Sequence, residues 1–222
     1  MTTTAICFDL DDTLYPYDEY ARAGLREAAD RLVELRGRHL HNELADLYFE
    51  EGITAHIFTR LVNRHDDLSQ SVTHDLVDAY HDSSVELEPY ADTVGVLELL
   101  SENHRLGVLS SGRNALEKLQ RLGLQGYFDT VISTERLDIS KTDQESFDRL
   151  CSTLSVQPER CIYVGDDPRT DFVAPNRLDI GTVRLRRGRF SHLDPDSDVA
   201  SPDVEIGRLE ELPSLIEASR LD

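Results

Sequence analysis

Aspartate residues cluster directly behind the first apolar segment of the chain. Asp9, Asp11, Asp12 and Asp18 follow the run AICF at residues 5–8. Carboxylates that lie close together repel one another, and their burial is costly unless a positive charge compensates it. A divalent metal ion together with a phosphate group would account for such a cluster. The spacing therefore predicts metal-assisted chemistry on a phosphate.

Further polar residues stand where three later apolar segments end. In open parallel sheets, ligands bind outside the carboxyl ends of the strands, so these residues would meet at one edge. Each is weak alone, because a lone DxD or Ser-Ser-Gly is most often a solvated turn or a helix cap. The hypothesis that they form one site rests on their order in the chain and on their common position after predicted strands. They are Ser110, Ser111 and Gly112, then Lys141, then Asp166 and Asp167, with Asp171 soon after.

Changes in hydrophobic periodicity mark the elements that would position these residues. Residues 4–9 have the pattern of a buried strand. Between Tyr17 and Ser83, apolar residues recur at spacings of three and four, which predicts four helices joined by short loops. The helices are expected in the segments YARAGLREAADRLVEL, HNELADLYFEE, ITAHIFTRLVNRH and VTHDLVDAYHD.

Helical and strand segments alternate from residue 89 onward. The predicted strands are RLGVLS (105–110), TVIS (130–133), RCIYVG (160–165) and GTVRL (181–185). A helical segment precedes each of them, and another is expected near LEELPSLIEAS. Alternating helices and buried strands predict an α/β fold with a doubly wound parallel sheet.

Acidic residues dominate the charge of the chain. Asp and Glu number 43 against 23 Lys and Arg, which gives a formal net charge of −20. This imbalance argues against nucleic acid or an anionic membrane as a partner. In roughly molar salt the Debye length falls to about 3 Å, so such self-repulsion becomes tolerable. We therefore interpret the surface as halophilic.

Cysteine usage favours a reducing compartment. Cys7, Cys151 and Cys161 are odd in number and have no CxxC spacing, so neither a disulfide framework nor a structural zinc site is expected. No secretion signal opens the chain, and no apolar run is long enough to span a membrane. We expect a cytoplasmic protein of one or two domains, and either a monomer or a homodimer fits the sequence.

Four segments resemble the motifs of the haloacid dehalogenase superfamily. They are FDLDDTLYP, GVLSSG, the isolated Lys141 and YVGDDPRTD. The resemblance implies a Rossmann-like core, residues 1–14 and 89–222, with an inserted helical cap, residues 15–88. It also implies a Mg²⁺-dependent phosphatase. The opening DLDDTLYP followed by YARAGLREAA is similar to a branch that acts on sugar phosphates, polyol phosphates and nucleotides.

The resemblance implies a role for each acid at the predicted edge. Asp9 would attack phosphorus and form an aspartyl-phosphate. Mg²⁺ would be held by Asp9, the backbone carbonyl of Asp11 and Asp166. Asp167 or Asp171 would hold the waters of the metal or orient the lysine.

The same resemblance assigns the remaining groups. Asp11 would protonate the leaving alkoxide and then take a proton from the hydrolytic water, with its side chain on the same side as Asp9. Ser110 and the N–H groups of Ser111 and Gly112, at a helix start, would hold phosphoryl oxygens. Lys141 would balance charge between Asp9 and the phosphate, and Thr13 would support the loop. The family often has proline after this lysine, whereas Thr142 stands here.

Substrate selection is expected to come from the cap and from loops near it. Asp12 is expected to face solvent, and so is the basic segment RLRRGRF, residues 184–190. The candidates to contact the leaving group are Tyr15, Tyr17, Arg60, Arg64, His65 and Arg113.

Several other activities occur on this fold. A 2-haloacid dehalogenase lacks the second acid of the first motif, so Asp11 argues against it. Phosphonate cleavage needs a cap lysine, and residues 15–88 contain none. A phosphomutase and a non-catalytic binding protein stay open. The expected function is hydrolysis of a small phosphorylated metabolite.

Overall fold

The computed structural model describes residues 5–218 and divides into two compact units. One unit comprises Met1–Tyr17 with Leu87–Asp222, and the other comprises Asp18–Glu86. We call them the sheet unit and the helical unit. The predicted core and cap have closely similar bounds, 1–14 with 89–222 and 15–88.

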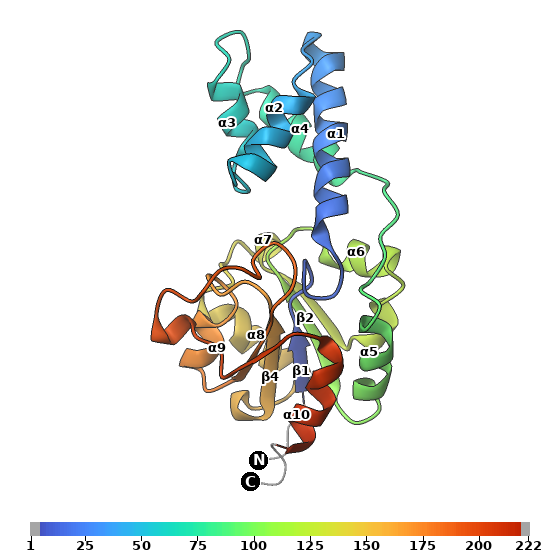
Figure 1. Cartoon of the computed structure of the whole chain (residues 1–222), viewed down its shortest axis with the longest axis vertical. Coiled ribbons are helices and arrows are strands. Elements are labelled where there is room, and N and C mark those ends of the chain that lie inside the picture. The colour runs from blue at the N-terminus through green and yellow to red at the C-terminus, as the bar shows by residue number, and fades with distance from the viewer. Residues whose placement is uncertain (1–4, 219–222) are drawn as a thin grey trace. The chain divides into compact units, whose positions relative to one another are not determined.

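The sheet unit is built on six parallel strands in the order β3-β2-β1-β4-β5-β6 (Figure 1). The first predicted strand lies at the centre, and its neighbours are the strands that precede Ser111 and Asp166. The α/β fold with a parallel sheet is thereby confirmed. The strands are β1 Ala5–Phe8, β2 Arg105–Ser110, β3 Thr130–Ser133, β4 Cys161–Gly165, β5 Gly181–Leu185 and β6 Val204–Ile206.

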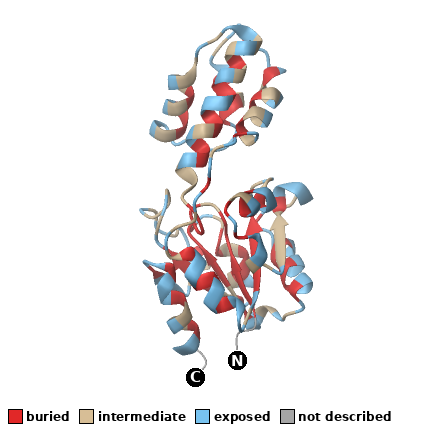
Figure 2. Cartoon of the chain, turned by 90° about the vertical axis from the view of Figure 1, so that its right-hand side faces the viewer, coloured by how far each residue is buried: buried red, intermediate tan, exposed pale blue. Residues whose placement is uncertain are grey.

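The central strand is buried on both faces (Figure 2). All four of its residues are apolar, as expected for a strand between two layers of helices. The register places Phe8 beside Val108 on one side and Val164 on the other. The ends of the three strands therefore lie within two residues of one another, and the polar residues at and after them emerge at one edge.

Helices cover both faces of the sheet, which makes it doubly wound (Figure 1). Phe147, Leu150 and Leu154 on α8 pack against the face that carries Ala5 and Cys7 of β1. The other face is covered by α5 and α10. The helices of this unit are α5 Thr93–Ser101, α6 Ala115–Arg121, α7 Thr134–Leu137, α8 Gln144–Leu154, α9 Val173–Arg177 and α10 Leu212–Ala218.

The three cysteines are buried in the hydrophobic core beneath α8. The sulfur atoms of Cys7 and Cys161 lie 3.6 Å apart on neighbouring strands, and all three thiols are free. All three cysteines are therefore small side chains of the core.

The helical unit contains the four predicted helices. They are α1 Tyr17–Arg36, α2 His41–Ala45 with a π-helical continuation Asp46–Glu50, α3 Ile57–Asn63 and α4 Val72–His81. Tyr80 of α4 makes edge contacts with the rings of Tyr20 and Phe58. Gly24 permits α1 to approach α4, because a Cβ atom there would lie 2.7 Å from Tyr80.

Two short elements were not predicted. The edge strand β6 has only three residues, two of them exposed, and it follows an acidic loop without hydrophobic alternation. The helix α7 is a single turn directly after β3. Neither is long enough to produce a periodic pattern.

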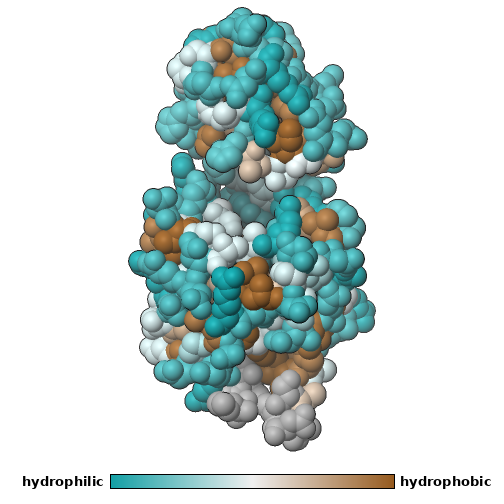
Figure 3. Space-filling view, turned by 90° about the vertical axis from the view of Figure 1, so that its left-hand side faces the viewer, coloured by the Kyte–Doolittle hydropathy of each residue, from teal (hydrophilic) through white to brown (hydrophobic). Residues whose placement is uncertain are grey.

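The surface shown in Figure 3 is mainly hydrophilic, with small separate apolar patches. Within residues 5–218, no helix combines the length and apolar character that crossing a membrane requires.

Candidate active site

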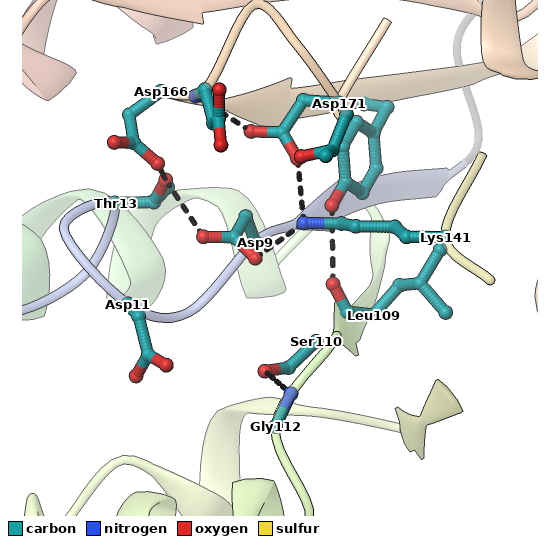
Figure 4. A network of polar contacts seen from close by, with 12 residues as sticks. Asp9, Asp11, Thr13, Leu109, Ser110, Gly112, Lys141, Asp166 and Asp171 are labelled. Carbon is teal, nitrogen blue, oxygen red and sulfur yellow. Dashed lines mark hydrogen bonds and ion pairs between the residues drawn. The ribbon is translucent and has the colours of Figure 1, made fainter. Parts of the chain in front are cut away.

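Lys141 lies between two carboxylates at the carboxyl edge of the sheet (Figure 4). Its Nζ atom is 2.5 Å from Asp9 Oδ1 and 2.6 Å from Asp171 Oδ1. Burial alone would lower the pKa of Lys141, but Asp171 and Asp9 outweigh it and hold that pKa well above its usual value. The lysine is therefore a fixed positive charge beside Asp9.

Asp166 lies on the other side of Asp9 and is joined to it through Thr13. The Thr13 hydroxyl lies 3.4 Å from Asp9 Oδ2 and 3.3 Å from Asp166 Oδ1. Asp166 is 2% exposed, and its Oδ2 atom has no hydrogen-bond partner among the described residues. A buried carboxylate oxygen without a partner is costly, so this atom suits an additional positive ligand.

Three carboxylates of the edge could hold a metal ion. Oxygen atoms of Asp9, Asp166 and Asp171 lie within 4.8 Å of one another. Burial, together with the neighbouring acids, raises the pKa of Asp9 to about 7 and that of Asp166 well above its usual value. A hard divalent cation would relieve this repulsion, and carboxylate oxygens are its preferred ligands. The donor set fits Mg²⁺.

Asp171 belongs to the acid cluster itself and contacts Lys141 directly. It bridges Lys141 and the backbone N–H of Asp167, which donates to Asp171 Oδ2 over 2.9 Å. Gly165 makes this possible, because a Cβ atom there would lie 2.3 Å from Asp171 Oδ2. Asp167 pairs instead with Arg169 at 2.8 Å.

Asp11 lies apart from the three acids and takes different partners (Figure 4). Tyr15 donates its hydroxyl to Asp11 Oδ1 over 2.6 Å. Lys118 contacts both carboxylate oxygens, at 2.7 and 2.9 Å. The expectation that Asp11 and Asp9 point to the same side is wrong, because these two donors draw the Asp11 carboxylate away.

Ser110 and Gly112 border the space in front of Asp11. Ser110 is buried, and its Oγ atom accepts the N–H of Gly112 over 3.2 Å. A Cβ atom on Gly112 would lie 3.6 Å from Ser110 Oγ and 3.8 Å from both Asp11 Oδ2 and Lys118 Nζ. These groups thus surround a common point. Ser111 is exposed.

The candidates for substrate contact are dispersed. Tyr15 is fully buried against Asp11, whereas Arg113 is exposed and pairs with Glu135 at 3.1 Å. Tyr17 belongs to the sheet unit, where its ring lies beside Arg189 and Lys118. The other three candidates belong to the helical unit. There Arg64 pairs with Glu51, His65 contacts Glu43, and Arg60 is exposed.

The prediction that Asp12 faces solvent is wrong. It is 2% exposed and adopts a left-handed backbone with φ of 63°. Its carboxylate accepts the N–H of Tyr17 over 3.1 Å and pairs with Arg189. The guanidinium of Arg189 also lies 4.2 Å from the centre of the Tyr17 ring. Asp12 therefore has a structural role at the start of α1.

The basic segment 184–190 is likewise not a solvated loop. Arg184 is fully buried in β5 and donates to the carbonyl oxygens of Phe190 and Leu193. Arg187 donates to the carbonyl of Thr13 and pairs with Asp92 at 2.7 Å. Through Arg187 and Arg189, the segment binds the loop that contains Asp9.

Lys118 and Arg189 are site neighbours that the sequence had not indicated. The rarity of lysine was the available signal for Lys118, because the chain contains only two. Nothing local marked Arg189, since its partner Asp12 lies 177 positions away.

Comparison with known proteins shows the family of the chain. The profile of the haloacid dehalogenase-like hydrolases matches residues 3–179. Glyceraldehyde 3-phosphate phosphatase of Methanopyrus kandleri is 34% identical over 220 residues, 94% of either chain. Ribulose-1,5-bisphosphate 5-phosphatase of Halopiger xanaduensis is 28% identical over 242 residues, 96% of this chain and 99% of that one.

A solved structure has the same fold. YfnB from Bacillus subtilis, bound to magnesium, has a TM-score of 0.75 at 18% identity, over 97% of this chain and 99% of that one. The extent of the profile match and the identity to the Methanopyrus enzyme are decisive. This chain belongs to the haloacid dehalogenase-like hydrolase family.

Proposed function

We propose that the protein is a Mg²⁺-dependent phosphomonoesterase of small phosphorylated metabolites that works through an aspartyl-phosphate. The observation that carries this proposal is the cluster of Asp9, Asp166 and Asp171, whose oxygens lie within 4.8 Å beside the buried Lys141. When bound there, Mg²⁺ would neutralise the acids and the phosphate dianion.

Asp9 is the nucleophile of the first step. One of its carboxylate oxygens forms a bond to phosphorus while the bond from phosphorus to the leaving oxygen breaks. Lys141 holds the Asp9 carboxylate in place and lowers the repulsion between two anions. The hydroxyl of Ser110, at the adjacent strand end, binds a phosphoryl oxygen.

Asp11 transfers the protons. It donates one to the leaving alkoxide, then accepts one from the water that attacks the aspartyl-phosphate, so that inorganic phosphate and free Asp9 are formed. Its separation from Asp9 fits this division of labour, because an acid–base group must reach the leaving oxygen on the far side of phosphorus.

The expected substrates are small phosphorylated sugars. Relatives that match nearly the whole chain are named for a triose phosphate and a pentulose bisphosphate. Phosphorylated sugars of about this size are therefore the first to test, followed by polyol phosphates and nucleotides. The free buried thiols and acidic composition support a reducing, salt-rich cytoplasm as the place of action.

Phosphate release in about molar KCl tests the proposal. p-Nitrophenyl phosphate and the substrate panel are incubated with wild type in MgCl₂ or EDTA. We expect turnover in MgCl₂, none in EDTA, and none with Asp9→Asn. Asp148→Asn, which removes an exposed carboxylate of α8, serves as the matched control and should keep full activity.

Other outcomes would identify the alternatives. Chloride release from 2-chloropropionate without metal would indicate a dehalogenase. Isomerisation of a sugar phosphate without phosphate release would indicate a mutase. No reaction with any compound would favour a binding protein.

A further inference from the structure

Lys118 is a buried lysine outside the cluster that would hold the metal. It lies on α6 and is 4% exposed, although lysine is rarely buried without a partner. Its partner is Asp11, whose two oxygens lie 2.7 and 2.9 Å from Nζ. The two lysines of the chain therefore hold two different acids of the same edge, since Lys141 holds Asp9.

The surroundings of Lys118 fix the ammonium group in place. Its Nζ atom lies 4.7 Å from the centre of the Tyr17 ring and 5.8 Å from that of Tyr15. Aromatic faces attract a cation and hold it more strongly where water is excluded. The Tyr15 hydroxyl donates to the same carboxylate that Lys118 contacts. Asp11 is thus oriented by two donors that are themselves packed.

Lys118 and Asp11 lie beside the loop that is proposed to bind the phosphoryl group. Lys118 Nζ and Asp11 Oδ2 both lie 3.8 Å from the Cβ position of Gly112, and Ser110 Oγ lies 3.6 Å from it. The pair therefore borders the loop proposed to bind phosphoryl oxygens. Lys141 lies on the other side, between Asp9 and Asp171.

We propose that Lys118 is a positioning residue for the acid–base carboxylate of Asp11. The inference rests on the proposed function, because it assigns the step that Lys118 assists. With Lys118 removed, the Tyr15 hydroxyl would be the remaining side-chain donor to the Asp11 carboxylate among residues 5–218, and one hydrogen bond does not fix both oxygens. A misplaced proton donor slows chemistry with little effect on substrate binding.

Kinetics of five variants, including Asp11→Asn alone, test the step through which Lys118 acts. Lys118→Met keeps an unbranched side chain that is one atom shorter and removes the charge. We expect it to lower kcat about tenfold to a hundredfold with little change in KM, and Lys118→Arg to recover part of the loss. In an Asp11→Asn background, Lys118→Met should cost little more. Arg149→Met, which removes a cation from an exposed pair on α8, is the control and should leave kcat unchanged.

A full multiplicative loss in the double variant would overturn the proposal, because Lys118 would then act independently of Asp11. Unchanged kcat in Lys118→Met would overturn it as well. The thermal unfolding midpoint of each variant shows whether it is folded.

A structural measurement separates this inference from the proposed function. Crystal structures of wild type and Lys118→Met should be compared. In the variant, the Asp11 carboxylate should occupy a different position or several alternate positions, while Asp9 and Lys141 keep their wild-type positions. An Asp11 carboxylate that keeps its place would overturn the positioning role, whatever the activity. A wild-type protein without phosphatase activity would refute the proposed function, while the Asp11 comparison would still decide this inference.

Discussion

At the scale of residues, the site is a set of acids separated by individual cations. Lys141 lies between Asp9 and Asp171, and Lys118 holds Asp11. The raised pKa values of Asp9 and Asp166 show that burial leaves negative charge in the cluster uncompensated. This local imbalance has consequences for stability as well as for activity.

The stability of the metal-free protein should depend on the charge of Asp9. The pKa of this carboxyl is about 7 in the folded protein and about 4 in an unfolded chain, so ionisation destabilises the fold as pH rises between these values. In EDTA at pH 8, Asp9→Asn should therefore raise the free energy of unfolding by about 1–3 kcal/mol. At pH 4 the free energies of unfolding of wild type and Asp9→Asn should be similar.

Thermal denaturation at both pH values checks this expectation. MgCl₂ should raise the midpoint of wild type more than that of the variant, because the ion offsets the charge that the variant lacks. A lower midpoint for Asp9→Asn in EDTA at pH 8 would contradict the account of uncompensated charge.

Asp11→Asn should separate the two chemical steps. p-Nitrophenolate leaves without protonation, so Asp9 should still be phosphorylated, whereas water attack would lack its base. We expect a burst of nitrophenolate, slow steady turnover and a phosphoryl adduct detectable by mass spectrometry in protein quenched during turnover. Steady turnover at the wild-type rate would remove Asp11 from the mechanism.

At the scale of elements, the loop after β1 is held by the segment after β5. Arg189 binds Asp12, and Arg187 binds the Thr13 carbonyl. Asp9, the proposed nucleophile, therefore lies on a loop held at two places. The N–H of Asp9 donates to the carbonyl of Val164 in β4, and the two arginines bind the residues that follow Asp9. Such support is required because a small displacement of a reacting group slows chemistry strongly.

Arg189→Gln should weaken this support. The substitution leaves the buried Asp12 carboxylate without its cation, and we expect a loss of about 1–3 kcal/mol together with reduced turnover. Arg186→Gln, which removes a more exposed arginine that pairs with Asp194, should cost about 1 kcal/mol or less. Urea unfolding measures both. Equal losses of unfolding free energy in the two variants would show that the contact of Arg189 with Asp12 stabilises the fold no more than an exposed ion pair does.

At the scale of the whole molecule, net charge governs behaviour in salt. The charge of −20 is spread over both units, and one cavity of the helical unit is lined by six acids together with Arg31 and Ala79. Those acids, on or adjoining α1 and α4, are Glu27, Asp30, Glu34, Asp75, Asp78 and Asp82. Repulsion among them is strongest when salt is low.

Stability should accordingly rise with KCl between about 0.1 M and 2 M. Replacing two of the acids, Glu27→Gln with Asp82→Asn, should raise the unfolding midpoint by about 2–4 °C at low salt and by less at high salt. Differential scanning calorimetry in the two buffers checks both expectations. A midpoint that falls as KCl is added would exclude the halophilic interpretation.

The sequence by itself determined the sheet and the residues at its edge. Apolar strands and the polar residues after them are local patterns, and parallel strands must bring Asp9, Ser110 and Asp166 to the same edge. The same reasoning placed the four helices of the inserted segment.

Only the tertiary structure decided which charges meet. Lys118 lies 107 positions from Asp11, and Arg189 lies 177 positions from Asp12. Locally, each arginine or lysine had the pattern of an exposed side chain, because periodicity records which face of an element is apolar. Whether a long cationic side chain reaches solvent or a buried carboxylate depends on how distant segments pack, and that is a property of the folded chain.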